Sequence, residues 1–234
     1  MPDELSTEMV KQAFEPVSDL VKRIAGPLAD EIGGYLGAIA RPYRVMREVK
    51  AMQKTKQMLK EANIAPQAVP PRLLLPIMEG ASIEDDEDLH SRWAALLANA
   101  CASPNSVHPS FIEILRQLAP DDAHLLDRLY DSCTSKGTRK VEAWVDTISY
   151  AEKERRIKEG ENPEDSFQNL IRLALIQADY EMDERRTSVK LAGPHAIVPP
   201  AKLKSYYELS DFAVKFVKAC RAPKTIDAST DGCA

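Results

Sequence analysis

Glycine and aromatic residues are scarce in this sequence: 9 of its 234 residues are glycine, and Phe, Trp and Tyr together make up 6%. A β-sandwich or β-barrel needs many turns and strands rich in aromatic side chains, so this composition argues against both. No run of 18 or more uncharged apolar residues occurs, which excludes a conventional transmembrane helix. The N-terminus is acidic and has no apolar stretch, so we expect neither a secretory nor a transit peptide.

Motifs for catalysis and metal binding are also missing. The four cysteines form no CxxC pair, so we expect reduced thiols and no structural zinc site; they are Cys101, Cys133, Cys220 and Cys233. The sequence contains no GxSxG, HExxH, P-loop or GxGxxG motif. We therefore predict that the protein is not an enzyme and that it uses no cofactor or metal.

The residues that are abundant favour helices. Ala, Leu, Glu and Lys are common, and 16 prolines punctuate the chain, so we predict a mainly α fold. The formal net charge is −5, which is not typical of a general nucleic-acid-binding protein.

Residues 26–40 form an unusual segment, because four of the nine glycines lie here. Gly33 and Gly37 are four residues apart, a spacing that lets a second backbone approach closely. The pattern predicts a helix that packs on a partner or lies in a membrane surface. The alternative is an ordinary helix in a tight helical hairpin.

Residues 41–61 carry seven basic and two acidic residues, a local charge of +5. Val45, Val49, Met52 and Leu59 recur at helical spacing and form an apolar face. A basic amphipathic helix can bind anionic lipid, nucleic acid or an acidic protein surface, although such faces are also often simply solvated. The candidate contact residues for a partner or membrane are Gly33, Gly37, Arg44, Arg47, Lys50 and Lys54.

Three prolines within residues 63–71 predict an extended linker, where we place the main domain boundary. After a short helix that starts at Pro71 or is interrupted near Pro76, Ser82 is the expected N-cap of the next helix, with Asp85 completing an acidic capping box. The run of acids at 84–88 then loads the N-terminus of that helix with favourable negative charge. Capping explains these acids better than a metal site does.

Residues 70–126 contain three dense motifs. Their residues are Pro70, Pro71, Pro76, Ile77 and Glu79; Leu89, Trp93, Ala94, Leu96, Leu97, Ala98, Asn99 and Ala100; and His108, Pro109, Ser110, Phe111, Glu113, Ile114, Leu115, Leu118, Pro120, Asp122, Ala123 and Leu126. Together these motifs resemble the abortive infection alpha family of bacteria. The resemblance implies a role in defence against phage, and it carries over no catalytic residue. Gly80 stands where the family commonly has alanine, a change for which we expect no functional consequence.

The C-terminal half resembles a winged helix-turn-helix domain. We expect helices at 121–133, from Thr138 onward, and at 163–177, followed by a β-hairpin with strands at 187–191 and 204–209. Ser210 is the expected cap of a final helix at 211–221.

The nucleic-acid interpretation of this half rests on its basic residues. The candidate recognition helix begins with Glu164 and Asp165, which would repel phosphates, so an interaction or dimerisation module is favoured over DNA binding. The residues that would contact nucleic acid are Arg185, Arg186, Lys190, Lys202 and Lys204.

The sequence thus predicts N-terminal helices at 1–65, a helical core at 66–119, a winged-helix-like domain at 120–222 and a flexible tail at 223–234. We expect a cytoplasmic defence protein, or one peripheral at the inner membrane, that acts through a protein partner, a second copy of itself or an anionic membrane surface. The alternative is a winged-helix transcriptional regulator that binds nucleic acid.

Overall fold

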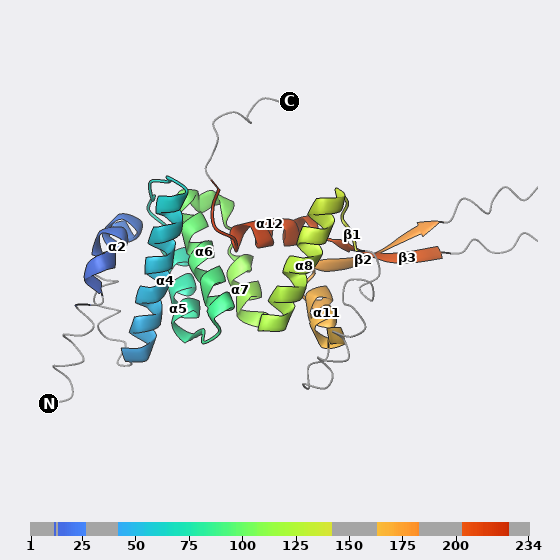
Figure 1. Cartoon of the computed structure of the whole chain (residues 1–234), viewed down its shortest axis with the longest axis horizontal. Helices are drawn as coiled ribbons and strands as arrows, with labels where there is room; N and C mark the ends of the chain where they lie inside the picture. Colours follow the sequence, from blue (N-terminus) through green and yellow to red (C-terminus); the bar gives the residue numbers. More distant parts are fainter. Residues whose placement is uncertain (1–11, 13, 27–41, 142–162, 183–202, 225–234) are drawn as a thin grey trace, which may run out of the picture. The chain divides into compact units, whose positions relative to one another are not determined.

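The computed structural model describes residues 12, 14–26, 42–141, 163–182 and 203–224. They belong to two compact units, one within residues 1–120 and 215–234 and the other within 121–214. Helices dominate both parts of the chain that the structure describes, so the prediction of a mainly α fold is confirmed (Figure 1).

The first unit begins with the 3₁₀ turn η1 (Glu15–Val17) and helix α2 (Ser18–Ala25), and α2 ends at Gly26 in a positive-φ conformation. Helix α4 (Pro42–Glu61) follows. Residues 27–41, with Gly33 and Gly37, lie outside the described residues, so the helix predicted there is not tested.

Helices α5 (Pro71–Ile83) and α6 (Glu87–Ala102) form the centre of the first unit with α4, which packs against both. Pro71 occupies the first turn of α5, where its missing N–H costs nothing, and the helix continues through Pro76 without interruption. The proline-rich linker therefore joins helices that pack on one another. The domain limits at 65 and 119 stay predictions.

The prediction that Ser82 caps the second of these helices is wrong. Ser82 is buried in the last turn of α5, where its hydroxyl donates to the Glu79 carbonyl at 2.7 Å. The N-cap of α6 is Asp86, whose carboxylate accepts from the backbone N–H groups of Asp88 and Leu89 at 3.0 and 2.8 Å. Because Glu84 and Asp86 are extended, the first free N–H groups lie four residues later than Ser82 would reach.

Two shorter helical elements complete this part of the first unit: η3 (Pro104–Ser106) and α7 (Ser110–Gln117). His108 has a structural role before α7, since its Nδ1 accepts from the Ser110 N–H at 3.2 Å. Phe111 packs edge-on against Phe216 with ring centroids 5.6 Å apart. The side-chain amide of Asn99 donates to the carbonyls of Ala219 and Arg221, at 2.9 and 2.8 Å.

The second unit contains most of α8 (Pro120–Lys136), then β1 (Lys140–Val141), α11 (Pro163–Arg172), β2 (Ile176–Met182), β3 (Leu203–Leu209) and the start of α12 (Asp211–Ala219). The strands form an antiparallel sheet in the order β1-β3-β2. Lys140 pairs with Glu208, and β2 pairs with β3 from Ile176–Leu209 to Met182–Leu203.

Several predictions for this unit need correction. The helix expected at 163–177 ends at Arg172, because Ala174 adopts a left-handed φ of 56° and turns the chain into β2. The helix expected from Thr138 onward does not begin there, because Thr138 precedes β1, whose Val141 pairs with Tyr207. The rest of that predicted helix, in 142–162, lies outside the described residues. The predicted strand at 187–191 lies outside the described residues, and the winged-helix assignment stays a prediction.

Other predictions in this half hold. The strand expected at 204–209 is β3, and the Ser210 hydroxyl accepts from the Ala213 N–H at 3.0 Å to cap α12. Cys101, Cys133 and Cys220 are buried and form no disulfide with one another, in agreement with the expectation of reduced thiols, and Cys233 is not among the described residues.

Gly80 in α5 has a packing role that the family resemblance did not suggest. A Cβ atom at this position would lie 2.4–2.7 Å from three atoms of the six-membered ring of Trp93. These separations are far below van der Waals contact, so the indole fits against α5 only because residue 80 has no side chain. This packing gives Gly80 a structural role, and it does not test the expectation that the glycine has no functional consequence.

We expect Gly80→Ala to lower the free energy of unfolding by up to about 2 kcal/mol, because an overpacking cost of about 1–3 kcal/mol is reduced by a gain of about 1 kcal/mol in helix propensity. Urea denaturation measures the change. Trp93→Phe provides the matched background, because it removes the ring atoms that would collide. If Gly80→Ala costs as much in the Trp93→Phe background as in the natural protein, the contact is not the cause.

Candidate functional site

Helix α4 holds the basic segment singled out from the sequence, and its apolar face is not available to a partner. Val45, Val49, Met52 and Leu59 are only 1–3% exposed. A helix lying in a membrane surface would insert this face among the acyl chains. Here the same face forms part of the core of the first unit, which argues against a membrane-surface role for α4 as it is folded.

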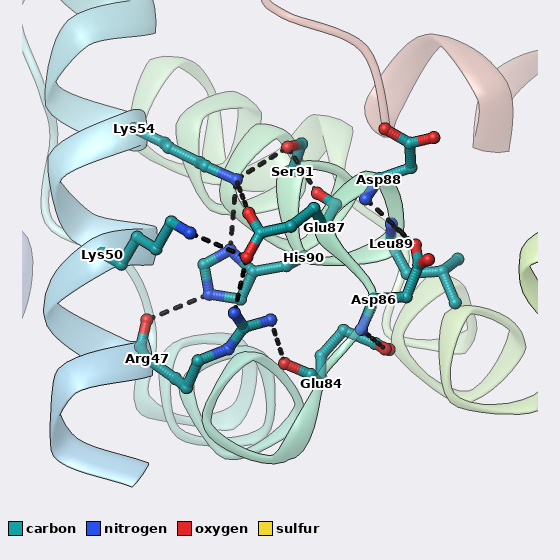
Figure 2. A network of polar contacts seen from close by, with 10 residues as sticks. All are labelled: Arg47, Lys50, Lys54, Glu84, Asp86, Glu87, Asp88, Leu89, His90 and Ser91. Atoms are coloured by element: carbon teal, nitrogen blue, oxygen red, sulfur yellow. Dashed lines mark hydrogen bonds and ion pairs between the residues drawn. The ribbon is translucent and has the colours of Figure 1, made fainter. Parts of the chain in front are cut away.

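Three of the four candidate basic residues on α4 converge on one carboxylate of α6. Arg47, Lys50 and Lys54 follow one another at spacings of three and four residues, so they share a face of the helix. Their nitrogens lie 2.7, 2.7 and 3.2 Å from the carboxylate of Glu87 (Figure 2). The basic face is therefore used largely inside the molecule.

Arg47 is the most deeply placed of these cations, with a side chain that is only 10% exposed. Besides Glu87 it donates to the backbone carbonyl of Glu84, just after the end of α5. Lys54 donates to the Ser91 hydroxyl at 2.8 Å, while the Lys50 side chain is still 45% exposed. The three cations thus tie the start and middle of α4 to the loop and first turn of α6.

His90 lies beneath this cluster and is fully buried. Its Nε2 is 3.0 Å from the Arg47 carbonyl and its Nδ1 is 3.4 Å from the Lys54 ammonium (Figure 2). A carbonyl can only accept and an ammonium can only donate, so Nε2 carries the proton and the ring is neutral. Burial lowers the pKa of His90 to about 4, even though the Arg47 carbonyl favours the charged form.

Both ring nitrogens of His90 are therefore engaged in holding α4 on α6. Sequence reasoning did not single out this histidine. One signal was present, because His90 stands three residues before Trp93 in the apolar periodicity of the helix.

Glu87 was expected only to favour the N-terminus of its helix, and it does more than that. Hydrogen bonds from Lys50, Arg47 and Lys54 lower the pKa of this carboxyl to about 2. It therefore stays ionised at any physiological pH and holds all three cations. Among the acidic run, Asp86 performs the capping that the sequence suggested, and Glu87 joins two helices.

Glu48 is a second unusual carboxyl, in the middle of the buried face of α4. It is 1% exposed, and its Oε2 has no hydrogen-bond partner. Burial raises the pKa of Glu48 to about 7, and the nearby Arg44 opposes this shift only in part. Keeping this carboxylate ionised in the core is therefore costly.

Neither Cys101 nor Cys133 is an activated thiol. Burial raises the pKa of Cys101 to about 12, and burial also raises the pKa of Cys133. No group of three His, Cys, Asp or Glu side chains among the described residues is placed to hold a metal ion. None of the helices in the described ranges is long and apolar enough to cross a membrane.

The residues suggested for nucleic-acid contact lie mostly outside the described chain: Arg185, Arg186, Lys190 and Lys202 do. Lys204 is in β3, opposite Glu181 of β2. In α11, Asp165 is exposed, and the guanidinium of Arg172 donates to Asn169 at 2.7 and 3.0 Å. The structure therefore does not test whether these candidate residues form one surface.

Comparison with known proteins identifies the family. The chain has two mainly helical units, and a family model described as abortive infection alpha matches residues 43–220. The protein belongs to the abortive infection alpha family, as the three sequence motifs suggested, and membership supports an abortive-infection-type function. Neither curated proteins nor solved structures yield a match.

We expect Glu48→Gln to stabilise the protein at high pH. Because the folded-state pKa is raised from 4.5 to about 7, the folded state binds more protons between these values, and stability falls as the pH rises through them. The amide removes this slope, so the variant should gain about 1–3 kcal/mol at pH 8 and little at pH 5.

Urea denaturation at the two pH values measures this difference. Glu61→Gln, an exposed position on the same helix, is the control and should show no such pH dependence. A Glu48→Gln variant that is no more stable than the natural protein at pH 8 would contradict the claim that the ionised Glu48 carboxylate destabilises the folded state.

We expect Glu87→Gln to lower the melting temperature at low salt, because three cations lose their common partner. The loss should shrink at about 1 M NaCl, where screening acts within about 3 Å. It should also shrink as the pH falls from 4.5 toward 2, where Glu87 of the natural protein becomes protonated. Asp88→Asn alters the same charge in the same helical turn, and an equally large effect there would show that the helix dipole is responsible.

Proposed function

We propose that this protein acts in abortive infection without catalysis, in the cytoplasm, by binding another protein through the first unit. The observation that carries the proposal is a group of exposed apolar side chains at one end of α4 and α5. A second argument supports the absence of catalysis: the side chains of His90 and Glu87 already hold α4 on α6.

The reactive side chains support a non-catalytic role because their chemistry is already in use. His90 has both ring nitrogens engaged, and its pKa of about 4 makes it a weak base at neutral pH. Glu87 holds three cations, and Cys101 stays a thiol. General bases and nucleophiles need a free lone pair and a pKa near the working pH. Glu48 has both, but it is only 1% exposed and so is out of reach of a substrate.

The proposed contact surface, here called the α4–α5 end surface, consists of Tyr43, Met46 and Ile83. They are 59%, 48% and 56% exposed. Tyr43 and Met46 lie in the first turns of α4, and Ile83 is the last residue of α5. The hydrogen bond from Arg47 to the Glu84 carbonyl brings these two helix ends together.

The neighbouring charges indicate what kind of partner fits. Arg44 follows Tyr43, and Lys50 lies one turn beyond Met46. Lys50 uses one of its three N–H groups on Glu87 and is still 45% exposed, so it can also donate to a partner. A protein surface with apolar side chains ringed by carboxylates would complement this arrangement. An anionic membrane fits less well, because the apolar face of α4 that would insert into lipid is buried in the core.

The test is a plaque assay on cells that express the full-length chain. We expect the Tyr43→Ser, Met46→Ser, Ile83→Ser triple variant to lose protection by about tenfold or more, as removal of a central apolar contact weakens a protein interface. Leu75→Ser is the matched control, since Leu75 is 42% exposed on α5 but lies two turns from Ile83. It should protect like the natural protein.

Three outcomes would overturn the proposal. The first is a triple variant that protects fully while expressed at the natural level. The second is the loss of protection in a His90→Gln variant whose melting temperature is unchanged, which would indicate catalysis. The third is sedimentation of the purified protein with anionic vesicles at low salt, abolished by the triple substitution, which would make a membrane the partner.

A further inference from the structure

A cleft of about 280 Å³ opens between α2, α4 and the linker that follows α4. Leu20 of α2 and Leu59 of α4 form its floor, and they are only 4% and 3% exposed. Ile64 and Pro66 of the linker continue the apolar lining. All of these residues belong to the first unit.

Hydrogen bonds on both sides of α2 hold this helix beside the cleft. Just before α2, in η1, the Pro16 carbonyl accepts from the Lys56 ammonium at 2.6 Å. At the far end, the Val69 N–H donates to the Ile24 carbonyl at 2.8 Å. Between these two attachments, Leu20 faces the cleft from one helix and Leu59 faces it from the other.

The rim of the cleft is cationic. It carries Arg23, Lys56 and Lys60 against a single acid, Asp19, which leaves two positive charges uncompensated. Within the described residues, neither Arg23 nor Lys60 forms an ion pair. Lys56 uses one of its three N–H groups on Pro16, so it too can still donate.

We propose that this cleft binds a small anionic amphiphile, a medium-chain carboxylate, with its apolar body on Leu20 and Leu59 and its head among Arg23, Lys56 and Lys60. Most ligand pockets are lined by apolar side chains with a few polar groups that fix orientation. Their usual volumes begin near about 300 Å³, so this cleft suits a short chain. The proposal does not rest on the protein interface proposed above.

Isothermal titration of the purified full-length protein with octanoate tests it. We expect saturable binding, at least about tenfold weaker for 1-octanol, which has the same tail without the charge. Acetate, which has the charge without the tail, should not bind. Equal affinity for octanoate and 1-octanol, or the absence of saturable octanoate binding, would overturn the proposal.

Two neighbouring residues of α2 supply the matched variants. Arg23 lines the cleft and Lys22 does not, although both are exposed cations on the same helix. Arg23→Glu should weaken octanoate binding by about tenfold, while Lys22→Glu, with the same change in net charge, should leave it unchanged. Ile64→Ser should weaken octanoate as well. If Lys22→Glu weakens octanoate as much as Arg23→Glu does, the binding is not at this cleft.

Discussion

The contact between α4 and α6 through Arg47 organises the first unit. The guanidinium binds the Glu87 carboxylate and the Glu84 carbonyl, while the Arg47 carbonyl accepts from the buried ring of His90. A cation that is nearly removed from water needs a charged partner, since desolvation otherwise outweighs the attraction. Glu87 provides that partner, and the two helices are held in one register as a result.

This contact also decides which surfaces remain for function. It occupies the basic face of α4 that appeared free to meet an anionic partner, and the core occupies the apolar face. The surfaces that remain accessible in the described part of the first unit include the α4–α5 end surface and the separate cleft beside α2. For a member of the abortive infection alpha family, recognition surfaces of this kind fit a mechanism by interaction.

Sequence periodicity predicted α4 and its buried face, because an amphipathic helix shows that face directly in its spacing. Sequence reasoning failed where two nearby residues had the same local preference. Ser82 and Asp86 are both good capping residues, and only the extended backbone at Glu84 decides between them. The strand at Ile176 and the two residues of β1 were missed because they depend on pairing with the distant β3.

The amino-acid sequence by itself determined the helical class, the family motifs and the position of the cationic helix. Those features follow from composition and short-range spacing, which can be read from the sequence without knowing how distant segments pack. Only the tertiary structure decided what each of these residues contacts. Arg47 pairs with Glu87, Glu48 is buried in the core, and Gly80 lies against the six-membered ring of Trp93. These pairings join residues 13 to 40 positions apart, and no local preference encodes which face of one helix will meet which face of another.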